Sequence, residues 1–384
     1  MNEQTLDKLQ YNDLIHHVER YCISGFGRNL LRNQRPTSHL QTVKKRLQET
    51  SEARAILDAT SHVPFIGVSD MEPLIGKISR GIQLEASELE AVAEFFRGAR
   101  KLKRFMAEQA FFAPLLSLYA GEMSEWRSIE EDIVQSIRGG RVVDEASKEL
   151  KRVRKQIDIL EGRIEERLSK FLKSAANREA IQDGFVTKKQ DRFTIPIKAS
   201  YKHKVAGAII DTSSRGTTVF IEPEAVAKLN AELVVKRTEE AVEIYQVLAT
   251  LTGMVAEALP TIEATLDVIA QYDMVFAKGK YSQAIDGIAP RVNAVGKIRL
   301  KQVRHPLLER AVPLDFSLGD TYRGLIITGP NAGGKTVVLK TIGLLSLMTM
   351  SGLHIPAHPD TDISSSPRPI TAKSKRTPRR IRTS

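Results

Sequence analysis

The feature that most constrains the fold is a narrow apolar seam in a highly charged segment between residues 144 and 174. Its members recur every three or four residues, with charges almost everywhere else: Leu150, Val153, Ile157, Leu160, Ile164, Leu168 and Leu172. This spacing is typical of one face of a long, solvated helix of the coiled-coil type. At 1.5 Å per residue, such a helix is a rod of roughly 50 Å.

A second seam follows further along the chain, and its members are Val226, Leu229, Leu233, Ala241, Ile244, Leu248, Leu251 and Val255. Two helices with matching seams predict an antiparallel pair that carries the intervening residues at its tip. The tip sequence has strand-like runs at 192–198, 204–211 and 217–221. Pro223 ends the last run and suits the first turn of the returning helix.

Helical periodicity dominates the chain before the first seam, and short strand patterns at 297–310 and 314–318 precede a glycine-rich loop. The predicted fold is therefore mainly α with an α/β C-terminal part. Its predicted parts are a helical core (1–143), antiparallel lever helices (144–257) with a small β clamp at about 183–222, a helical return to the core (258–296), and a truncated P-loop ATPase domain of the ABC type (297–358).

The glycine-rich loop has the form G-x-x-x-x-G-K-[ST], and its residues are Gly329, Pro330, Asn331, Ala332, Gly333, Gly334, Lys335 and Thr336. A short buried-strand pattern at 324–328 precedes it and a helical pattern at 337–348 follows, which is the context of a nucleotide-binding loop. We expect the loop amides to bind phosphates at a helix N-terminus, and Lys335 to reach the β- and γ-phosphates. Thr336 is the expected Mg²⁺ ligand, so ATP and Mg²⁺ are the predicted cofactors.

ATP hydrolysis needs a carboxylate from a second strand to hold Mg²⁺. After Lys335 the only acidic residues are Asp360 and Asp362, in a segment without a buried-strand pattern. We therefore expect ATP binding without hydrolysis. The helix at 337–350 is apolar around much of its circumference, and few strands are predicted to cover it. This predicts an exposed apolar surface and marginal folding.

Residues 359–384 are rich in Pro, Ser, Thr and basic residues, a composition typical of disorder. One interpretation is a basic tail that binds nucleic acid, and the other is translation out of frame.

Basic residues gather at the predicted β tip, and Lys198, Lys202, Lys204 and Arg215 are the candidate nucleic-acid ligands. Lys plus Arg number 57 against 46 Asp plus Glu, a formal net charge of +11. This charge fits either general solubility or a polyanionic partner such as DNA or a ribosome. A basic tip at the end of a rod has the geometry of a grip on such a partner.

Cys22 is the only cysteine, which excludes an internal disulfide and a cysteine-based zinc site. The N-terminus is too polar for a signal peptide, and the apolar stretch at 342–350 is too short to span a bilayer. The sequence therefore predicts a cytoplasmic protein with no membrane partner.

Five stretches together carry a family resemblance: NEQTLDKLQYNDLI at the start, VVDEASKELKRVRKQI entering the rod, RFTIPIKASYKHKVAGAIIDTSSRGTTVFIEP at the tip, VRHPLLER, and ITGPNAGGKTVVLKTIGLLSLMTMSGLHIPAH around the loop. In their order, residues 1 to about 358 resemble the MutS ATPases, specifically the second bacterial MutS paralogue. The loop alone is shared with many ATPases, whereas the RHP element and the lever-and-tip arrangement make the resemblance specific.

The resemblance implies a helical core, lever helices ending in a clamp, and an ATPase domain that forms homodimers. It also implies suppression of homologous recombination at branched DNA, rescue of stalled, collided ribosomes through rRNA binding, or both, with a nuclease-like domain at the far C-terminus. The domain that reads mismatches is expected to be absent, so the F-x-E stretch at Phe220–Glu222 is interpreted as coincidental. After about His358 the sequence departs from the family pattern in the segments that carry ATP hydrolysis, dimerisation and strand cleavage.

Two alternatives stay open. One is a non-enzymatic short form that grips nucleic acid through its basic tip. The other is an ABC-type or chromosome-maintenance ATPase, because GPNAGGKT resembles their loops too.

Overall fold

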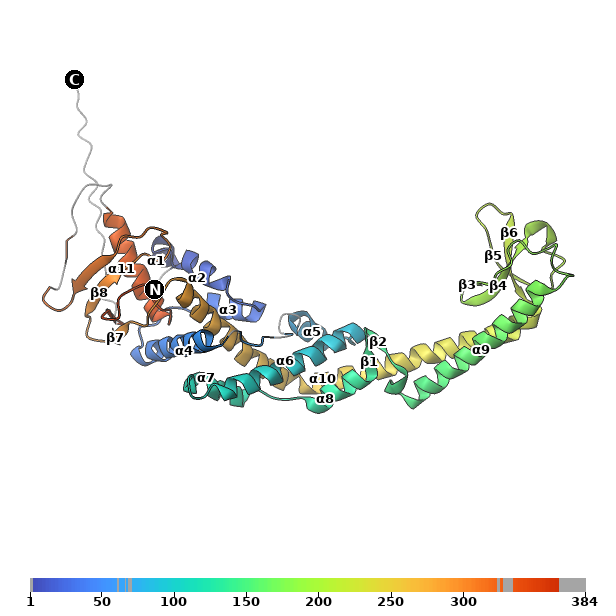
Figure 1. Ribbon diagram of the computed structural model, residues 1–384, viewed down its shortest axis with the longest axis horizontal. Coiled ribbons are helices and arrows are strands. Elements are labelled where there is room, and N and C mark those ends of the chain that lie inside the picture. The colour runs from blue at the N-terminus through green and yellow to red at the C-terminus, as the bar shows by residue number, and fades with distance from the viewer. Residues whose placement is uncertain are drawn as a thin grey trace, which may run out of the picture. The chain divides into compact units, whose positions relative to one another are not determined.

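The computed structural model describes residues 3–60, 62–65, 67, 71–322, 325–326 and 334–365 (Figure 1). These residues form two compact units. Unit 1 draws on Met1–Glu72, Glu94–Trp126 and Ala258–Ser384, and unit 2 on Pro73–Ala93 and Arg127–Glu257. The units differ from the predicted ranges, because the N-terminal helices share a unit with the C-terminal sheet. Periodicity identifies a helix but not the element against which its apolar face packs.

Unit 2 is built on a helical pair, α9 (Lys148–Lys173) and the first part of α10 (Glu224–Ala284). The N-cap of α9 is Ser147, whose side chain accepts hydrogen bonds from the amides of Glu149 and Leu150. Six of the seven predicted seam residues of α9 are buried, and Leu172 is half-buried, which confirms the first seam. The helix runs beside α10 with a small sheet at its far end (Figure 1).

The second seam is confirmed at its two ends, where Val226, Leu233, Leu251 and Val255 are buried. Ala241 was predicted to belong to it but is exposed. Seven residues after Leu233, the inward position is taken by Glu240, which pairs with Arg154 of α9 at 2.7 Å. Ala241 is the next residue along the helix, so it points away from the α9 partner and toward solvent.

The tip is an antiparallel sheet of strand order β3-β4-β6-β5, with bounds Thr187–Lys189, Arg192–Lys198, Gly207–Thr212 and Thr218–Pro223. The three predicted strand runs correspond to β4, β5 and β6, and β3 was not predicted. Apolar side chains of β4 and β6, including Ile195 and Ile221, pack in one core with Ile164 and Leu168 of α9. The sheet and the helical pair therefore stabilise each other.

Unit 2 also contains α8 (Arg127–Ser136), a two-stranded hairpin of β1 (Ile137–Arg138) and β2 (Arg141–Val142), and the 3-10 turn η2 (Asp144–Ala146). Helices α5 (Met71–Ile78) and α6 (Ala86–Glu108) contribute residues to both units, as does α10.

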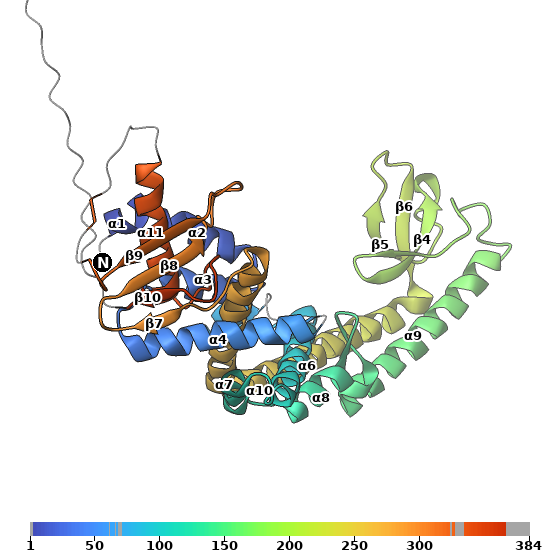
Figure 2. The same cartoon turned by 60° about the vertical axis from the view of Figure 1, so that its left-hand side comes forward.

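Unit 1 combines helices with a small sheet. The helices are α1 (Glu3–Lys8), α2 (Tyr11–Glu19), α3 (Gly25–Asn33), α4 (Leu40–Ala59), α7 (Pro114–Tyr119), η1 (Ala120–Glu122) and α11 (Lys335–Met350). The strands are β7 (Arg291–Asn293), β8 (Ile298–Val303), β9 (Leu314–Leu318) and β10 (Asp362–Ser364). Their order is β7-β10-β8-β9, and Figure 2 shows this sheet with α11 beside it. Strands β8 and β9 confirm the predicted strand patterns.

The start of the predicted disordered tail is instead part of this sheet. Strand β10 pairs parallel with β7 and antiparallel with β8, and Ile363 is fully buried. The prediction of disorder from residue 359 was therefore wrong for residues 359–365, and residues 366–384 lie outside the described residues. The segment has a single large apolar side chain, so its strand depends on backbone pairing with β7 and β8 and leaves no periodic pattern.

The predicted exposed apolar surface on the loop helix is also largely wrong. From Thr341 to Met350, all residues of α11 except the half-buried Ser346 are buried, and the helix packs against α2, α4 and β10. Helices α2 and α4, from the beginning of the chain, cover α11, whereas the sequence predicted only strands as its cover. Only the first turns retain exposed apolar groups, such as Val337.

No single described helix is both long and apolar enough to cross a membrane. The segments Glu224–Glu257 and Leu259–Ala284 of α10 pass that test only when they are taken together, by length and composition.

Candidate nucleotide and nucleic-acid sites

The predicted phosphate loop is described only at its C-terminal end. Gly334 adopts φ +75° and directly precedes α11, where a residue with a Cβ would be strained. Lys335 begins the helix, and Thr336 is exposed. The predicted ligands Gly329, Pro330, Asn331, Ala332 and Gly333 lie outside the described residues.

The strand predicted at 324–328 is not present in its described part. Leu325 and Ile326 belong to no strand, and their side chains are 55% and 88% exposed. A strand that is apolar on both faces needs strands on its sides and helices on its faces. Among the described residues, none pairs with 325–326, so the prediction of a buried strand here was wrong.

The start of α11 can still hold an anion. Four backbone amides at the N-terminus of an α-helix have no partner within the helix, and the helix dipole favours negative charge there. Gly334 and Thr336 are both exposed, so this terminus is open to solvent. A phosphate group bound there would also be within reach of a hydroxyl suited to Mg²⁺.

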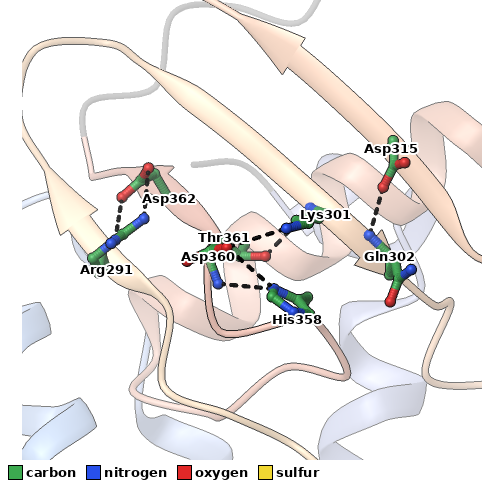
Figure 3. Close-up of polar contacts among 8 residues, drawn as sticks. All are labelled: Arg291, Lys301, Gln302, Asp315, His358, Asp360, Thr361 and Asp362. Atoms are coloured by element: carbon green, nitrogen blue, oxygen red, sulfur yellow. Dashed lines mark hydrogen bonds and ion pairs between the residues drawn. The ribbon is translucent and has the colours of Figure 1, made fainter.

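The two carboxylates that follow α11 are engaged within the sheet (Figure 3). Asp362 pairs with Arg291 at 2.9 Å, and Asp360 pairs with Lys301 at 3.1 Å. The hydrogen bond and charge of Lys301 lower the pKa of Asp360. These carboxylates join β10 to β7 and β8. Within the described ranges, no group of three or more His, Cys, Asp or Glu side chains is placed to hold a metal ion.

Two further contacts fix the same region (Figure 3). The amide of Lys301 donates to the hydroxyl of Thr361 at 3.3 Å, and the amide of Gln302 donates to Asp315 at 2.7 Å. Gln302 has φ +50° and lies where the register of the β8–β9 pairing shifts. Its amide donates to the Asp315 carboxylate in place of a backbone carbonyl of the neighbouring strand.

The RHP element links the sheet to α11. The amide of Arg304 donates to the carbonyl of Pro356 at 3.0 Å. His305 is buried, and burial together with the nearby charge of Lys340 on α11 lowers its pKa. The buried imidazole of His305 therefore lies close to Lys340 of the loop helix.

A polar network that was not anticipated anchors the C-terminal end of α11. Lys278 of α10 is buried and donates to the carbonyl of Ser351 at 2.9 Å, while the hydroxyl of Tyr11 contacts the Ser351 hydroxyl at 2.6 Å. His354 lies between the hydroxyls of Ser51 and Ser282, at 2.9 and 2.8 Å. The loop helix is thus tied to α2, α4 and α10. The only signal of this network in the sequence is a polar residue, such as Lys278, within an apolar helical run.

The basic residues of the tip divide into two groups. Those of β3 and the start of β4 have acidic partners: Lys188 with Glu161, Lys189 with Asp211, and Arg192 with Glu222, at 3.1, 3.1 and 2.9 Å. Although burial raises the pKa of Glu161, hydrogen bonds from Arg237 and Lys188 lower it overall. These basic residues are therefore already neutralised locally.

The predicted ligands lie at the other end of the tip sheet, in residues 198–204 and 213–217, which we call the turn end. The amide of Ala199 donates to the carbonyl of Thr217 at 2.9 Å, which joins these two segments. Lys202, Lys204 and Arg215 are exposed, and none of them forms an ion pair with a described residue. Lys204 lies over the ring of Tyr201, 4.8 Å from its centroid.

Lys198 is the least available of the four predicted ligands. It is half-buried, and its ammonium donates to the carbonyl of Glu179 at 3.1 Å. The turn end therefore gathers three free cationic groups and one that is partly used, on a sheet whose core is rigidly packed.

The F-x-E stretch has a structural role at the base of the tip. Glu222 is 3% exposed, receives two hydrogen bonds from Arg192, and accepts one from Asn230 at 2.7 Å. Asn230 also pairs with both the amide and the carbonyl of Phe193, at 3.1 and 3.0 Å. Asn230 lies one helical turn after the seam residue Val226, and a polar residue at that position is the signal that the sequence offered for this contact.

The chain matches known proteins over nearly its whole length. The chain is similar to proteins named Endonuclease MutS2. It is 36% identical to the one from Alkaliphilus oremlandii (strain OhILAs) over 369 residues, 95% of this chain and 47% of that relative. It is 37% identical to the one from Shouchella clausii (strain KSM-K16) over 363 residues, 93% of this chain and 46% of that relative.

A third relative, the Endonuclease MutS2 of Bacillus velezensis (strain DSM 23117 / BGSC 10A6 / LMG 26770 / FZB42), is 36% identical over 93% of this chain. The similarity supports a place in the MutS2 family, as the sequence resemblance predicted. No protein-family model matches the chain. The chain spans about half the length of these MutS2 relatives.

Proposed function

We propose that this chain is a MutS2-type protein that binds the phosphate backbone of nucleic acid with the turn end of its tip. The observation that carries this proposal is the segregation of charge on the tip. Lys188, Lys189 and Arg192 are paired with acids, whereas Lys202, Lys204 and Arg215 are exposed without an ionic partner among the described residues. Unpaired cations on a rigid support attract phosphates in a salt-dependent way.

We further propose that the chain binds ATP with Mg²⁺ at the start of α11. The support is the open helix N-terminus at Gly334, together with Lys335, Thr336 and the loop motif in sequence. The biological role that follows from MutS2 similarity is suppression of homologous recombination at branched DNA, rescue of stalled ribosomes through rRNA, or both. Mismatch recognition does not follow, since the buried Glu222 occupies the F-x-E stretch. A homodimer and a cytoplasmic location belong to the same proposal.

The test of the nucleic-acid proposal replaces Lys198, Lys202 and Lys204 together by Ala. Binding to a labelled 24-bp DNA duplex is measured by fluorescence anisotropy at several salt concentrations. The slope of log K against log salt is negative, and each lost phosphate contact reduces its magnitude by about 0.9. The magnitude should therefore decrease by about 2 to 3 in the tip variant. The matched control replaces exposed Lys8, Arg20 and Arg310 of unit 1. Equal slopes in the tip variant and the control would refute the proposal that the turn end binds the phosphate backbone.

The test of the nucleotide proposal uses a fluorescent ATP analogue and the Lys335→Ala variant. Loss of binding at unchanged thermal stability supports the site, and unchanged binding overturns it. Hydrolysis is measured separately, because turnover sensitive to Lys335→Ala favours an ATP-driven enzyme over a binding protein.

A further inference from the structure

The β1–β2 hairpin of unit 2 presents two arginines at one point. Arg138 and Arg141 lie directly opposite each other across the two-residue turn formed by Gly139 and Gly140. Both glycines have positive φ, of 59° and 70°, as a tight two-residue hairpin turn requires. Like charges placed directly opposite each other destabilise a strand pair, so this arrangement is not explained by hairpin stability.

The hairpin holds these arginines outward and in place. Ile137 and Val142, the alternate residues of the two strands, are 2% and 5% exposed and fix the hairpin in the core of unit 2. Arg138 and Arg141 are exposed, and neither forms an ion pair with a described residue. The result is a rigid support with two free guanidinium groups.

The acids Glu90, Asp144 and Glu240 form contacts with groups other than Arg138 and Arg141. Glu90 accepts a hydrogen bond from the amide of Gly140 at 2.7 Å and so holds the turn. Asp144 and Glu240 both pair with Arg154. Neither of these contacts neutralises Arg138 or Arg141.

The first turns of α9 extend the basic surface. Arg154 donates to the carbonyl of Val142 at 3.0 Å, which places this part of α9 beside the hairpin. Exposed basic residues on these turns are Lys148, Lys151, Arg152 and Lys155. Arg152 pairs with Glu149, and the three lysines have no ion pair among the described residues. We call Arg138, Arg141 and these three lysines the hairpin patch.

The hairpin patch and the turn end lie toward opposite ends of α9. In both views the hairpin and the tip sheet project from the same side of the helical pair (Figures 1 and 2). From Arg154 to the end of α9 at Lys173 and into the tip, the helical rise gives a separation of roughly 30–40 Å. That is about one turn of B-form DNA, which is 34–36 Å, so one face of a duplex meets both surfaces.

From this geometry we propose that the hairpin patch is a second backbone-binding site, and that duplex DNA lies along the helical pair between the patch and the turn end. Arginine suits this role because its planar fork binds phosphate oxygens in a bidentate manner. The inference rests on the proposed function, since it adds a contact to the same bound duplex. Each guanidinium contacts one phosphate, without reading base sequence.

The test uses four proteins: the wild type, the Arg138→Ala/Arg141→Ala variant, the Lys198/Lys202/Lys204 tip variant, and an Arg20→Ala/Arg310→Ala control with the same loss of charge. Binding is measured by anisotropy with a 24-bp DNA duplex, an 8-bp duplex closed by a loop, and a 24-bp RNA duplex. Thermal unfolding of each variant checks the fold. The replaced hairpin side chains are exposed, so their loss should leave unfolding unchanged.

With the 24-bp DNA duplex, the hairpin variant should lower the slope of log K against log salt by about 2, one for each phosphate contact. The 8-bp duplex is about 27 Å long at 3.4 Å per base pair, too short to reach both surfaces. The wild type should therefore bind the 24-bp duplex with the larger slope, and the hairpin variant should lose that difference.

A hairpin variant whose slope equals that of the control overturns the inference. If the tip variant alone loses slope, the inference fails and the proposed function stands. If the hairpin variant alone loses slope, the proposed function fails at the turn end and the inferred path of the duplex between the two surfaces fails with it, although the hairpin patch still binds the backbone. A loss of slope with the RNA duplex but not with DNA overturns the assignment to duplex DNA.

Discussion

The buried amine of Lys278 should make unit 1 more stable as the pH rises above neutrality. This side chain is 1% exposed and donates to the carbonyl of Ser351 and to the side chain of Gln34. Burial is the main cause that lowers its pKa from 10.5 to about 7, and the negative charge of Glu49 offsets this only in part. The perturbation is Lys278→Met, which keeps the length of the side chain and removes the titration.

The sign follows from proton binding in the two states. Between pH 7 and 10.5, the unfolded chain holds a proton on Lys278 and the folded chain releases it. Unfolding therefore takes up a proton, and the free energy of unfolding increases with pH across this window. For a single group with these two pKa values, the increase from pH 7 to pH 9 is about 2 kcal/mol. Below pH 7, both states are protonated and this contribution stays constant.

The assay is urea unfolding of both proteins at several pH values from 7 to 9, followed by fluorescence. Trp126 is the only tryptophan, lies in unit 1 with Lys278, and packs on Phe96 with ring centroids 4.6 Å apart. Other titrating groups contribute equally to both proteins, so the difference between the two slopes isolates Lys278. Parallel pH dependence in the wild type and in Lys278→Met would refute a neutral, buried amine.

Three further outcomes are expected, each from urea unfolding. Leu168→Ala should destabilise unit 2 by about 3 kcal/mol, against at most about 0.5 for the exposed Ile159→Ala on the same helix; similar values would contradict the buried seam. Asn230→Ala should cost about 2–3 kcal/mol, because it leaves the buried amide and carbonyl of Phe193 without their partner, and a near-neutral effect would count against that pairing. His354 has a pKa lowered to about 4, mainly by burial, so the stability present above pH 6.5 should fall by roughly 3 kcal/mol on acidification to pH 4. His354→Gln should lack this loss, and an identical acid profile would exclude a buried neutral imidazole.

The helical pair shows how far local pattern determines structure. The 3- and 4-residue spacing of α9 specified which side chains are buried, because an α-helix has a fixed period and only one of its faces meets the partner. Three of the four strands of the tip were identified for the same reason, since alternation and β-branched residues mark a half-buried strand. The one interruption, at Ala241, came from the ion pair of Arg154 with Glu240, which depends on the partner helix.

The candidate sites show the opposite case. The seven Lys and Arg residues of the tip look alike in sequence, and only pairing with Glu161, Asp211 and Glu222 separates the neutralised group from the turn end. The opposed pair of Arg138 and Arg141 likewise needs the hairpin register to be seen. Neighbours in space decide which charges are free, and those neighbours come from other parts of the chain.

The sequence by itself determined the class of most elements, the first seam and three of the four strands of the tip, because each depends on residues close together along the chain. Only the tertiary structure decided what covers α11, that residues 359–365 enter a sheet, and that burial lowers the pKa values of Lys278 and His354. These depend on contacts between residues up to 340 positions apart, as between Tyr11 and Ser351. Local periodicity carries no record of such pairs, since burial and charge state are properties of the assembled core.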